Sequence, residues 1–139
     1  MDDPRSNRKL VEDFLTAVFI NHDLSHLGRY LTDEYIQHNP DVAQGRAGFE
    51  AFFVTTFKAM PDFRYTMKQM VADGDRVWVY SRTTATHTGG PWLDMPPSGN
   101  RLDFDVVDMF RIENGKIAEH WDVADTLSLF SQLGKVKAP

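Results

Sequence analysis

The segment 104–125 constrains the fold of this chain most, because its sequence is typical of a β-hairpin. It reads FDVVDMFRIENGKIAEHWDVAD, with Glu113-Asn114-Gly115 between two runs rich in β-branched and aromatic residues. An Asn-Gly pair between such runs is the strongest short-range signal for a hairpin. The two strands carry carboxylates and a histidine, so the pairing of the strands decides which polar groups share a face.

Two loop lengths fit this turn. A three-residue loop, which we favour, places Asp108 opposite His120. It also places Val106 opposite Asp122, so that Asp108, His120 and Asp122 share one face. A two-residue Asn-Gly turn instead places Asp108 opposite Trp121, on the other face. In the favoured pairing that face is otherwise apolar, as in a ligand pocket. Its apolar residues are Phe104, Val106, Phe110, Ala118 and Ala124.

Length and composition indicate one compact domain over residues 1–139, since the chain is 42% hydrophobic. A net charge of −5 argues against nucleic acids and anionic membranes as partners, because clustered Lys and Arg bind both. No apolar run approaches the roughly 20 residues that cross a bilayer. We see no secretory signal pattern and therefore expect a cytoplasmic protein. The absence of cysteine excludes disulfides and thiolate catalysis.

Helical periodicity dominates the first part of the chain, and strand-like runs dominate the second. Asp3 and Asp125 are expected to cap the first and last helices, and Asp23 a short second one. The expected helices are 4–20, 24–31, 46–60 and 126–133; the expected strands are 35–38, 63–71, 77–87 and the two arms of the hairpin, with a loop over 88–100. Helices followed by a mainly antiparallel sheet predict an α+β domain. We expect a cone-shaped, cystatin-like form, with helices packed on a curved sheet and a pocket between them.

Several short motifs occur in one order over nearly the whole chain. They are Tyr35-Ile36-Gln37-His38-Asn39-Pro40 followed by Gly45, Thr86-His87-Thr88-Gly89, Pro96-Pro97, Asp108-Met109-Phe110-Arg111, Asn114-Gly115-Lys116-Ile117 and Glu119-His120-Trp121-Asp122. Together they resemble the SnoaL-like polyketide cyclases of the nuclear-transport-factor-2-like superfamily. The resemblance implies an α+β cone, a homodimer packed through its sheet, and cofactor-free ring closure by an intramolecular aldol reaction. It also implies a general acid and base on the final strand, where Asp122 is the matching position.

The candidate catalytic residues all lie on the hairpin. Asp122 could shuttle a proton if apolar surroundings raise its pKa; otherwise it caps, pairs with a charge or faces solvent. His120 could hold that proton or stabilise an enolate. Asp108 lies in an apolar run and needs a partner, which is His120 in the favoured pairing, although a purely structural pair would explain it as well. The ketosteroid isomerases of the superfamily use a protonated aspartate as an oxyanion donor, and Asp108 is the matching position.

Five further residues are candidates for substrate binding. His38 ends a short strand at a turn, and His87 closes the long strand beside a glycine pair. Tyr80, Trp92 and Phe110 could stack on a planar substrate, although core packing explains such aromatic residues as well. We expect no metal site, because the histidines lack the His-x-x-x-His spacing of helical ligand pairs and His120-x-Asp122 alone is a weak signal.

The leading hypothesis is a cofactor-independent cyclase, isomerase or lyase. Its substrate would be a small apolar carbonyl compound, such as a polyketide-like molecule or an ester. Asp122 would remove a proton alpha to the carbonyl, and His120 would orient Asp122 or hold the enolate oxygen. The alternative is a module of the same fold that binds a small molecule or assembles as a dimer without catalysis. A hydrolase, which needs an activated water, is a third possibility.

Overall fold

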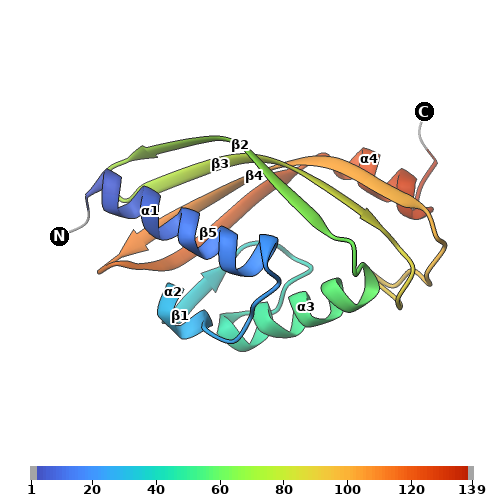
Figure 1. Cartoon of the computed structure of the whole chain (residues 1–139), viewed down its shortest axis with the longest axis horizontal. Coiled ribbons are helices and arrows are strands. Elements are labelled where there is room, and N and C mark those ends of the chain that lie inside the picture. Colours follow the sequence, from blue (N-terminus) through green and yellow to red (C-terminus); the bar gives the residue numbers. More distant parts are fainter. Residues whose placement is uncertain (1–2, 138–139) are drawn as a thin grey trace.

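A curved sheet of five strands forms the centre of the fold, and helices cover one of its faces (Figure 1). The computed structural model describes residues 3–137. In chain order the elements are α1 (Pro4–Leu15), the π-helix η1 (Thr16–Ile20), α2 (Leu27–Tyr30), β1 (Leu31–Gln37), α3 (Gly45–Ala59), β2 (Arg64–Asp73), β3 (Arg76–Thr86), β4 (Arg101–Glu113), β5 (Lys116–Ala124) and α4 (Thr126–Leu133). The predicted α+β class is confirmed.

The strand order in the sheet is β1-β5-β4-β3-β2. Strands β2 to β5 pair antiparallel with their neighbours, whereas β1 runs parallel to β5. The parallel pair brings the end of β1 beside the middle of β5, with Gln37 opposite His120. Residues more than eighty positions apart therefore meet on one face of the sheet.

The first helix forms where its capping residues and periodicity predict it. The Asp3 side chain accepts a hydrogen bond from the backbone N–H of Arg5, and Pro4 occupies the first turn. Its apolar face is buried against the sheet through Val11 and Phe14. The predicted extension to residue 20 is also helical, but with the wider π-helical turn.

The second predicted helix is largely wrong. Asp23 caps no helix, because its carboxylate accepts a hydrogen bond from the backbone N–H of Ser25 in a local turn. Helix α2 contains only residues 27–30, and Leu31 already opens β1, four residues before the predicted strand. The closing helix is confirmed: Asp125 accepts from the backbone N–H of Ser128, and Gly134 ends the helix with φ 85°.

Aromatic rings join the helices to the sheet. The Phe14 ring of α1 lies 6.0 Å from Phe110 of β4 and 5.8 Å from Phe49 of α3, measured between ring centroids. The Phe14–Phe110 pair is edge-to-face, and aromatic pairs of this geometry contribute about 0.5–1.5 kcal/mol each beyond the area they bury. This cluster fixes the distance between the helices and the sheet and hence the space left for a cavity.

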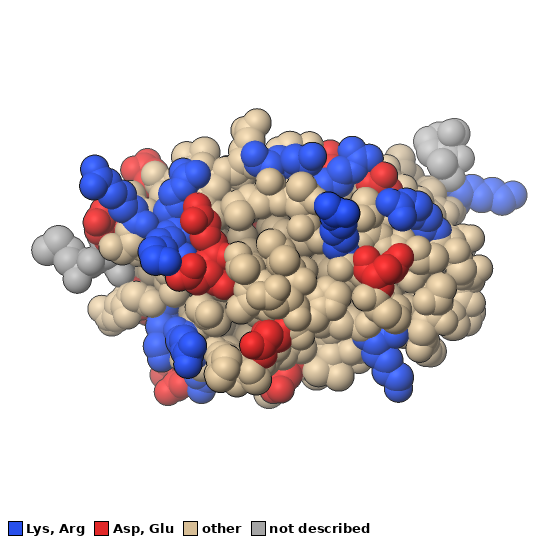
Figure 2. Space-filling model, in the orientation of Figure 1, with Lys and Arg blue, Asp and Glu red and all other residues tan. Residues whose placement is uncertain are grey.

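Charged side chains on the helical side of the molecule lie mostly toward the periphery, around a central region of other residues (Figure 2). Lys and Arg are interspersed with Asp and Glu rather than collected in one basic patch on this face. No helix within residues 3–137 has the length and hydropathy needed to span a bilayer.

The β4–β5 hairpin turns through two residues, not the three that we favoured. Asn114 and Gly115 have φ values of 50° and 76°, and Glu113 pairs directly with Lys116. Positive φ at both central residues is the pattern of a type I′ turn, whose twist matches that of the flanking strands. The predicted loop length is therefore wrong.

A β-bulge in β5 then compensates for the shorter turn. Ile112 pairs with Ile117, but Arg111 pairs with Glu119, so Ala118 is an extra residue on β5. Beyond the bulge, Phe110 faces His120 and Asp108 faces Asp122. The predicted opposition of Asp108 and His120, and that of Val106 and Asp122, is wrong by two residues. Because a two-residue error preserves the face, the predicted sharing of one face by the three polar residues is confirmed.

The turn geometry can be tested by substitutions with different expected effects at its two central positions. Gly115→Ala should lower the free energy of unfolding by about 1–2 kcal/mol, because a Cβ is disfavoured at positive φ. A Cβ there would meet no atom within 4 Å, so the loss is conformational. Asn114→Gly should change it by less than about 0.5 kcal/mol, since glycine accepts positive φ readily. Urea unfolding measures both, and a Gly115→Ala variant as stable as the parent would contradict this turn.

Candidate active site

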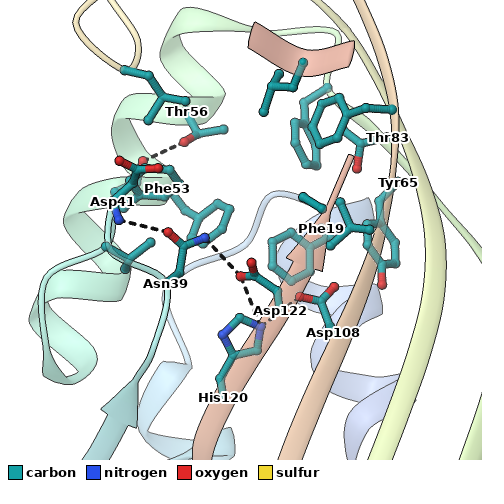
Figure 3. A pocket seen from close by; sticks show the side chains of 18 of the residues that line it. Phe19, Asn39, Asp41, Phe53, Thr56, Tyr65, Thr83, Asp108, His120 and Asp122 are labelled. Carbon is teal, nitrogen blue, oxygen red and sulfur yellow. Dashed lines mark hydrogen bonds and ion pairs between the residues drawn. The ribbon is translucent and has the colours of Figure 1, made fainter. Parts of the chain in front are cut away.

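A cavity of about 370 Å³ lies between the sheet and the helices. Its wall is mainly aromatic and aliphatic, and among the described residues that line it there is no lysine or arginine. The carboxylates of β4 and β5 and an imidazole lie together on one side of it (Figure 3). The aromatic residues of the wall are Phe14, Phe19, Phe49, Phe52, Phe53, Phe63, Tyr65, Trp92, Phe104, Phe110 and Phe130.

The three predicted catalytic residues come together in this wall. His120 Nε2 lies 2.8 Å from Asp108 Oδ1 and 3.8 Å from Asp122 Oδ2. All three side chains are largely buried. The contact between His120 and Asp108 runs diagonally across the two strands, because the residue directly opposite Asp108 is Asp122. Two carboxylates and one imidazole therefore share a small volume beside an apolar cavity.

Asn39 orients one of these carboxylates. Its Nδ2 donates to Asp122 Oδ2 at 2.9 Å. The amide is held in this orientation because its Oδ1 accepts from the backbone N–H of Asp41 at 2.9 Å. No hydrogen bond to the other carboxylate oxygen, Asp122 Oδ1, occurs within residues 3–137, so this oxygen is available for a ligand.

Gln37 contacts the imidazole from the opposite side. Its Oε1 lies 2.7 Å from His120 Nδ1, and its Nε2 donates to the hydroxyl of Tyr35 at 2.8 Å. Gln37 also forms two hydrogen bonds with Gln44, the residue that precedes α3. The imidazole is therefore held between the end of β1 and Asp108 of β4.

Burial controls the acidity of the groups in this wall. It raises the pKa of Asp122, and the nearby charges of Asp108 and Asp41 act in the same direction. His120 and the hydrogen bond from Asn39 oppose this shift without cancelling it. Burial, and the charge of Asp108, also raise the pKa of Tyr35 and of Tyr65, so both hydroxyls stay protonated. A carboxylate with a raised pKa can accept and return a proton at mild pH.

Two of the five predicted substrate-binding residues, Trp92 and Phe110, lie in the cavity wall. Trp92 Nε1 donates to Thr56 Oγ1 of α3 at 2.9 Å, which anchors the 88–100 loop over the cavity. Their role toward a substrate stays a prediction.

The other three predicted binding residues do not line the cavity. His38 comes after the inward-facing Gln37 and turns to the outer side, where its ring stacks on Trp121 and its Nε2 contacts Glu119 at 2.6 Å. Tyr80 alternates with the buried Val79 and therefore points out of the sheet. His87 is fully buried, with Nε2 2.7 Å from the carbonyl oxygen of Gly90, and holds the loop together.

Sequence reasoning missed Gln37 and Asn39 as site residues. Both flank His38 in the motif quoted above, and the histidine drew the prediction to the wrong position. The alternation of a strand offered a signal, since Tyr35 and Gln37 are buried on one side of β1 while Ile36 is exposed on the other. Only the parallel pairing of β1 with β5 indicates that this side faces the hairpin aspartates.

Comparison with known proteins assigns the family. A family model described as "SnoaL-like polyketide cyclase" matches residues 9–133. The chain belongs to this family. It is 29% identical over 136 residues to the aklanonic acid methyl ester cyclase DauD of Streptomyces sp. (strain C5), covering 92% of this chain and 79% of that protein. It is 35% identical over 95 residues to the "Probable cyclase otaY" of Aspergillus niger, covering 68% and 76%.

Solved structures share the fold of this SnoaL-like chain. TsrD from Streptomyces laurentii superposes with a TM-score of 0.86 at 34% sequence identity, covering 98% of this chain and 100% of that one. A SnoaL-like polyketide cyclase from Jannaschia sp. superposes with a TM-score of 0.83 at 22% identity, covering 100% and 99%. The solved structures support the fold, the family model shows the family, and the relatives of the chain include cyclases.

The polar cluster of this SnoaL-like protein also has the composition of a small metal site. Asp108, His120 and Asp122 each offer one ligand atom, and these atoms lie within 4.8 Å of one another. One imidazole and two carboxylates suit a divalent cation. The same atoms already have protein partners, since His120 contacts Asp108 and the amide of Asn39 donates to Asp122. The expectation of a metal-free site stays a prediction.

The raised pKa of Asp122 predicts how a substitution affects stability as the pH changes. The pKa of such a carboxyl is higher in the folded state than in the unfolded state. The free energy of unfolding therefore falls as the pH rises from the unfolded-state pKa through the folded-state pKa. Asp122→Asn removes this cost and leaves Asn39 an acceptor. Its melting temperature should exceed that of the parent at pH 7, and the gain should disappear toward the ordinary Asp value of 3.8.

The matched control is Asp103→Asn. Hydrogen bonds from Arg82 on the outer side of the sheet lower the pKa of Asp103, so its contribution to stability is present at neutral pH and is lost as the pH falls. This variant should be no more stable than the parent at pH 7. Thermal unfolding followed by circular dichroism over pH 3.5–8 compares the two. An Asp122→Asn variant that melts below the parent at pH 7 would contradict the buried-charge interpretation.

Proposed function

We propose that this protein is a cofactor-independent cyclase that closes a ring in a small neutral carbonyl compound by an intramolecular aldol reaction. The observation that carries the proposal is the environment of Asp122. Its carboxylate is largely buried, has a raised pKa, and is oriented through Oδ2 while Oδ1 stays available. A positioned carboxylate of this kind is a general base for carbon acids.

The cavity supports a flat, uncharged substrate. Aromatic rings make up much of the wall and would stack on a planar molecule. Asp41, Asp108 and Asp122 line the cavity without a lysine or arginine among its described residues, so a free carboxylate or phosphate would meet three aspartates and no permanently charged cation. A ketone or an ester avoids this repulsion. The relative DauD is an aklanonic acid methyl ester cyclase, and an ester substrate is consistent with this class.

In the proposed reaction Asp122 Oδ1 takes the proton from the carbon alpha to a carbonyl. The electron pair of the broken C–H bond forms an enolate, whose oxygen shares the Nε2–H of the protonated His120 with Asp108 Oδ1. Asp108 stabilises the positive charge on that imidazole. The enolate carbon then attacks a second carbonyl of the same molecule, a C–C bond forms, and the new alkoxide takes the proton back from Asp122. No atom is lost and no oxidant is needed.

Removing the base should abolish most of the turnover. Asp122→Asn is expected to lower kcat by a factor of about 10² to 10⁴ without unfolding the protein. Aklanonic acid methyl ester is the first substrate to test, followed by other neutral aromatic polyketide esters, with product formation measured by liquid chromatography and mass spectrometry. Asp103→Asn, which changes a carboxylate outside the cavity, should retain full turnover. Equal rates for Asp122→Asn and the parent would remove Asp122 from this role.

Chelation separates this proposal from a metal mechanism. Because the proposed groups all belong to the protein, turnover should survive dialysis against EDTA. A loss that a divalent cation restores would assign the chemistry to an ion held by Asp108, His120 and Asp122. Saturable binding of the esters with no product from any of them would favour the non-catalytic binding module instead.

We further propose that the protein forms a homodimer through the outer face of its sheet. Strand pairing aligns the apolar residues of this face in two neighbouring rows. One row is Val71, Trp78, Met109 and Trp121; the other contains Tyr80, Val107 and Val123. Trp78 is 53% exposed and Val123 is 66% exposed. A contiguous apolar surface on the outer face of a sheet is typical of a protein interface, and the self-complementary partner is a second copy.

A charge placed on this face should separate the dimer. Trp78→Glu combined with Val123→Glu is expected to convert the dimer into a monomer, because a buried unpaired carboxylate opposes association. Val54→Glu is the matched control, since Val54 is 53% exposed on α3, away from the sheet face. Size-exclusion chromatography with light scattering reads the mass directly. A parent protein that elutes as a monomer at micromolar concentration would overturn the proposal.

A further inference from the structure

We propose that Gln37 is a positioning residue that fixes the tautomer of His120. It does so by keeping a proton on Nδ1, so that Nε2 alone exchanges protons with the two aspartates. The inference deepens the proposed function, because it assigns the proton-exchanging atom of the same site. It rests on hydrogen bonds at the end of β1, and its main test needs no substrate.

The orientation of the Gln37 amide follows from its neighbours. The backbone N–H of Asn39 can only donate, and it lies 3.0 Å from Gln37 Oε1. This atom is therefore the oxygen, and the opposite end of the amide is the NH₂ group, which donates to the hydroxyl of Tyr35. A carbonyl oxygen has two lone pairs, so Oε1 accepts from Asn39 and has one site left. That site faces His120 Nδ1 at 2.7 Å.

An amide oxygen cannot donate a hydrogen bond, so the short contact requires a proton on Nδ1. The protonation state of Nε2 then depends on Asp108, whose Oδ1 lies 2.8 Å away. Either Nε2 carries a proton beside an ionised Asp108, or neutral His120 accepts a proton from a neutral Asp108. Asp122, at 3.8 Å from the same nitrogen, is the second carboxylate that faces it. Gln37 thus directs the exchangeable proton of His120 toward the cavity wall.

The position of Gln37 is well determined. Its side chain is almost fully buried, with the residue 4% exposed. Gln44 holds its backbone from both sides, because Oε1 of Gln44 accepts from the Gln37 N–H at 2.9 Å and Nε2 of Gln44 donates to the Gln37 carbonyl at 2.6 Å. The oxygen and the nitrogen of this buried amide both have hydrogen-bond partners. The amide therefore has little freedom to rotate and donate to His120 in the opposite tautomer.

Long-range ¹H–¹⁵N correlation spectra of protein labelled at histidine nitrogen test the inference. His120→Gln identifies the His120 signals among the five histidines of the chain. In the parent, Nδ1 should be protonated both below and above the titration of His120. In Gln37→Leu the amide oxygen is gone, and an unprotonated Nδ1 with a protonated Nε2 should become detectable at high pH. Gln69→Leu, on the exposed part of β2, should leave the His120 signals unchanged.

A second variant covers the case in which Gln37→Leu does not fold. Gln37→Glu retains an oxygen acceptor at the same position, so Nδ1 of His120 should stay protonated in it as in the parent. An unprotonated Nδ1 in the parent would overturn the inference, as would an unprotonated Nδ1 in Gln37→Glu. A protein that shows the expected tautomer but turns over no ester would refute the proposed function and leave the role of Gln37 intact.

Discussion

One extra residue in β5 determines where the site forms. A two-residue type I′ turn alone would have placed Asp108 on one face of the sheet and His120 and Asp122 on the other. The bulge at Ala118 shifts the pairing by one residue, so that His120 and Asp122 face the cavity together with Asp108. Bulges commonly redirect side chains beside active sites. The rest of the polar network depends on this local irregularity.

The site combines an apolar cavity with charged groups that such a cavity disfavours. Burial of Asp122 costs stability when the carboxylate is ionised, and the hydrogen bond from Asn39 and the neighbouring His120 offset only part of that cost. The same imbalance makes the group a competent proton acceptor and donor at mild pH. Stability and chemistry thus act in opposite directions at one side chain, as is common where groups are held ready for reaction.

The chain after β1 connects the two halves of the network. Gln37 contacts the imidazole and Asn39 the carboxylate, while His38 between them points to the outer side of the sheet. Because β1 pairs in parallel with β5, the side-chain amides of Gln37 and Asn39, two residues apart, both reach residues of the hairpin. Because Asn39 is itself held by the backbone of Asp41, the orientation of Asp122 depends on the conformation of a short loop.

The sequence by itself determined the α+β class, the capped first and last helices, the hairpin, and the shared face of His120 and Asp122, which alternate along one strand. These follow from periodicity and turn chemistry, which act over a few residues. Only the tertiary structure decided the pairing within the hairpin, because a bulge leaves no clear trace in composition. It also decided that Gln37 and Asn39, rather than His38, reach the site, and that Tyr80 lies outside the cavity. The placement of Gln37 and Asn39 depends on which strand lies beside β5, and that of Tyr80 depends on which face of β3 the helices cover.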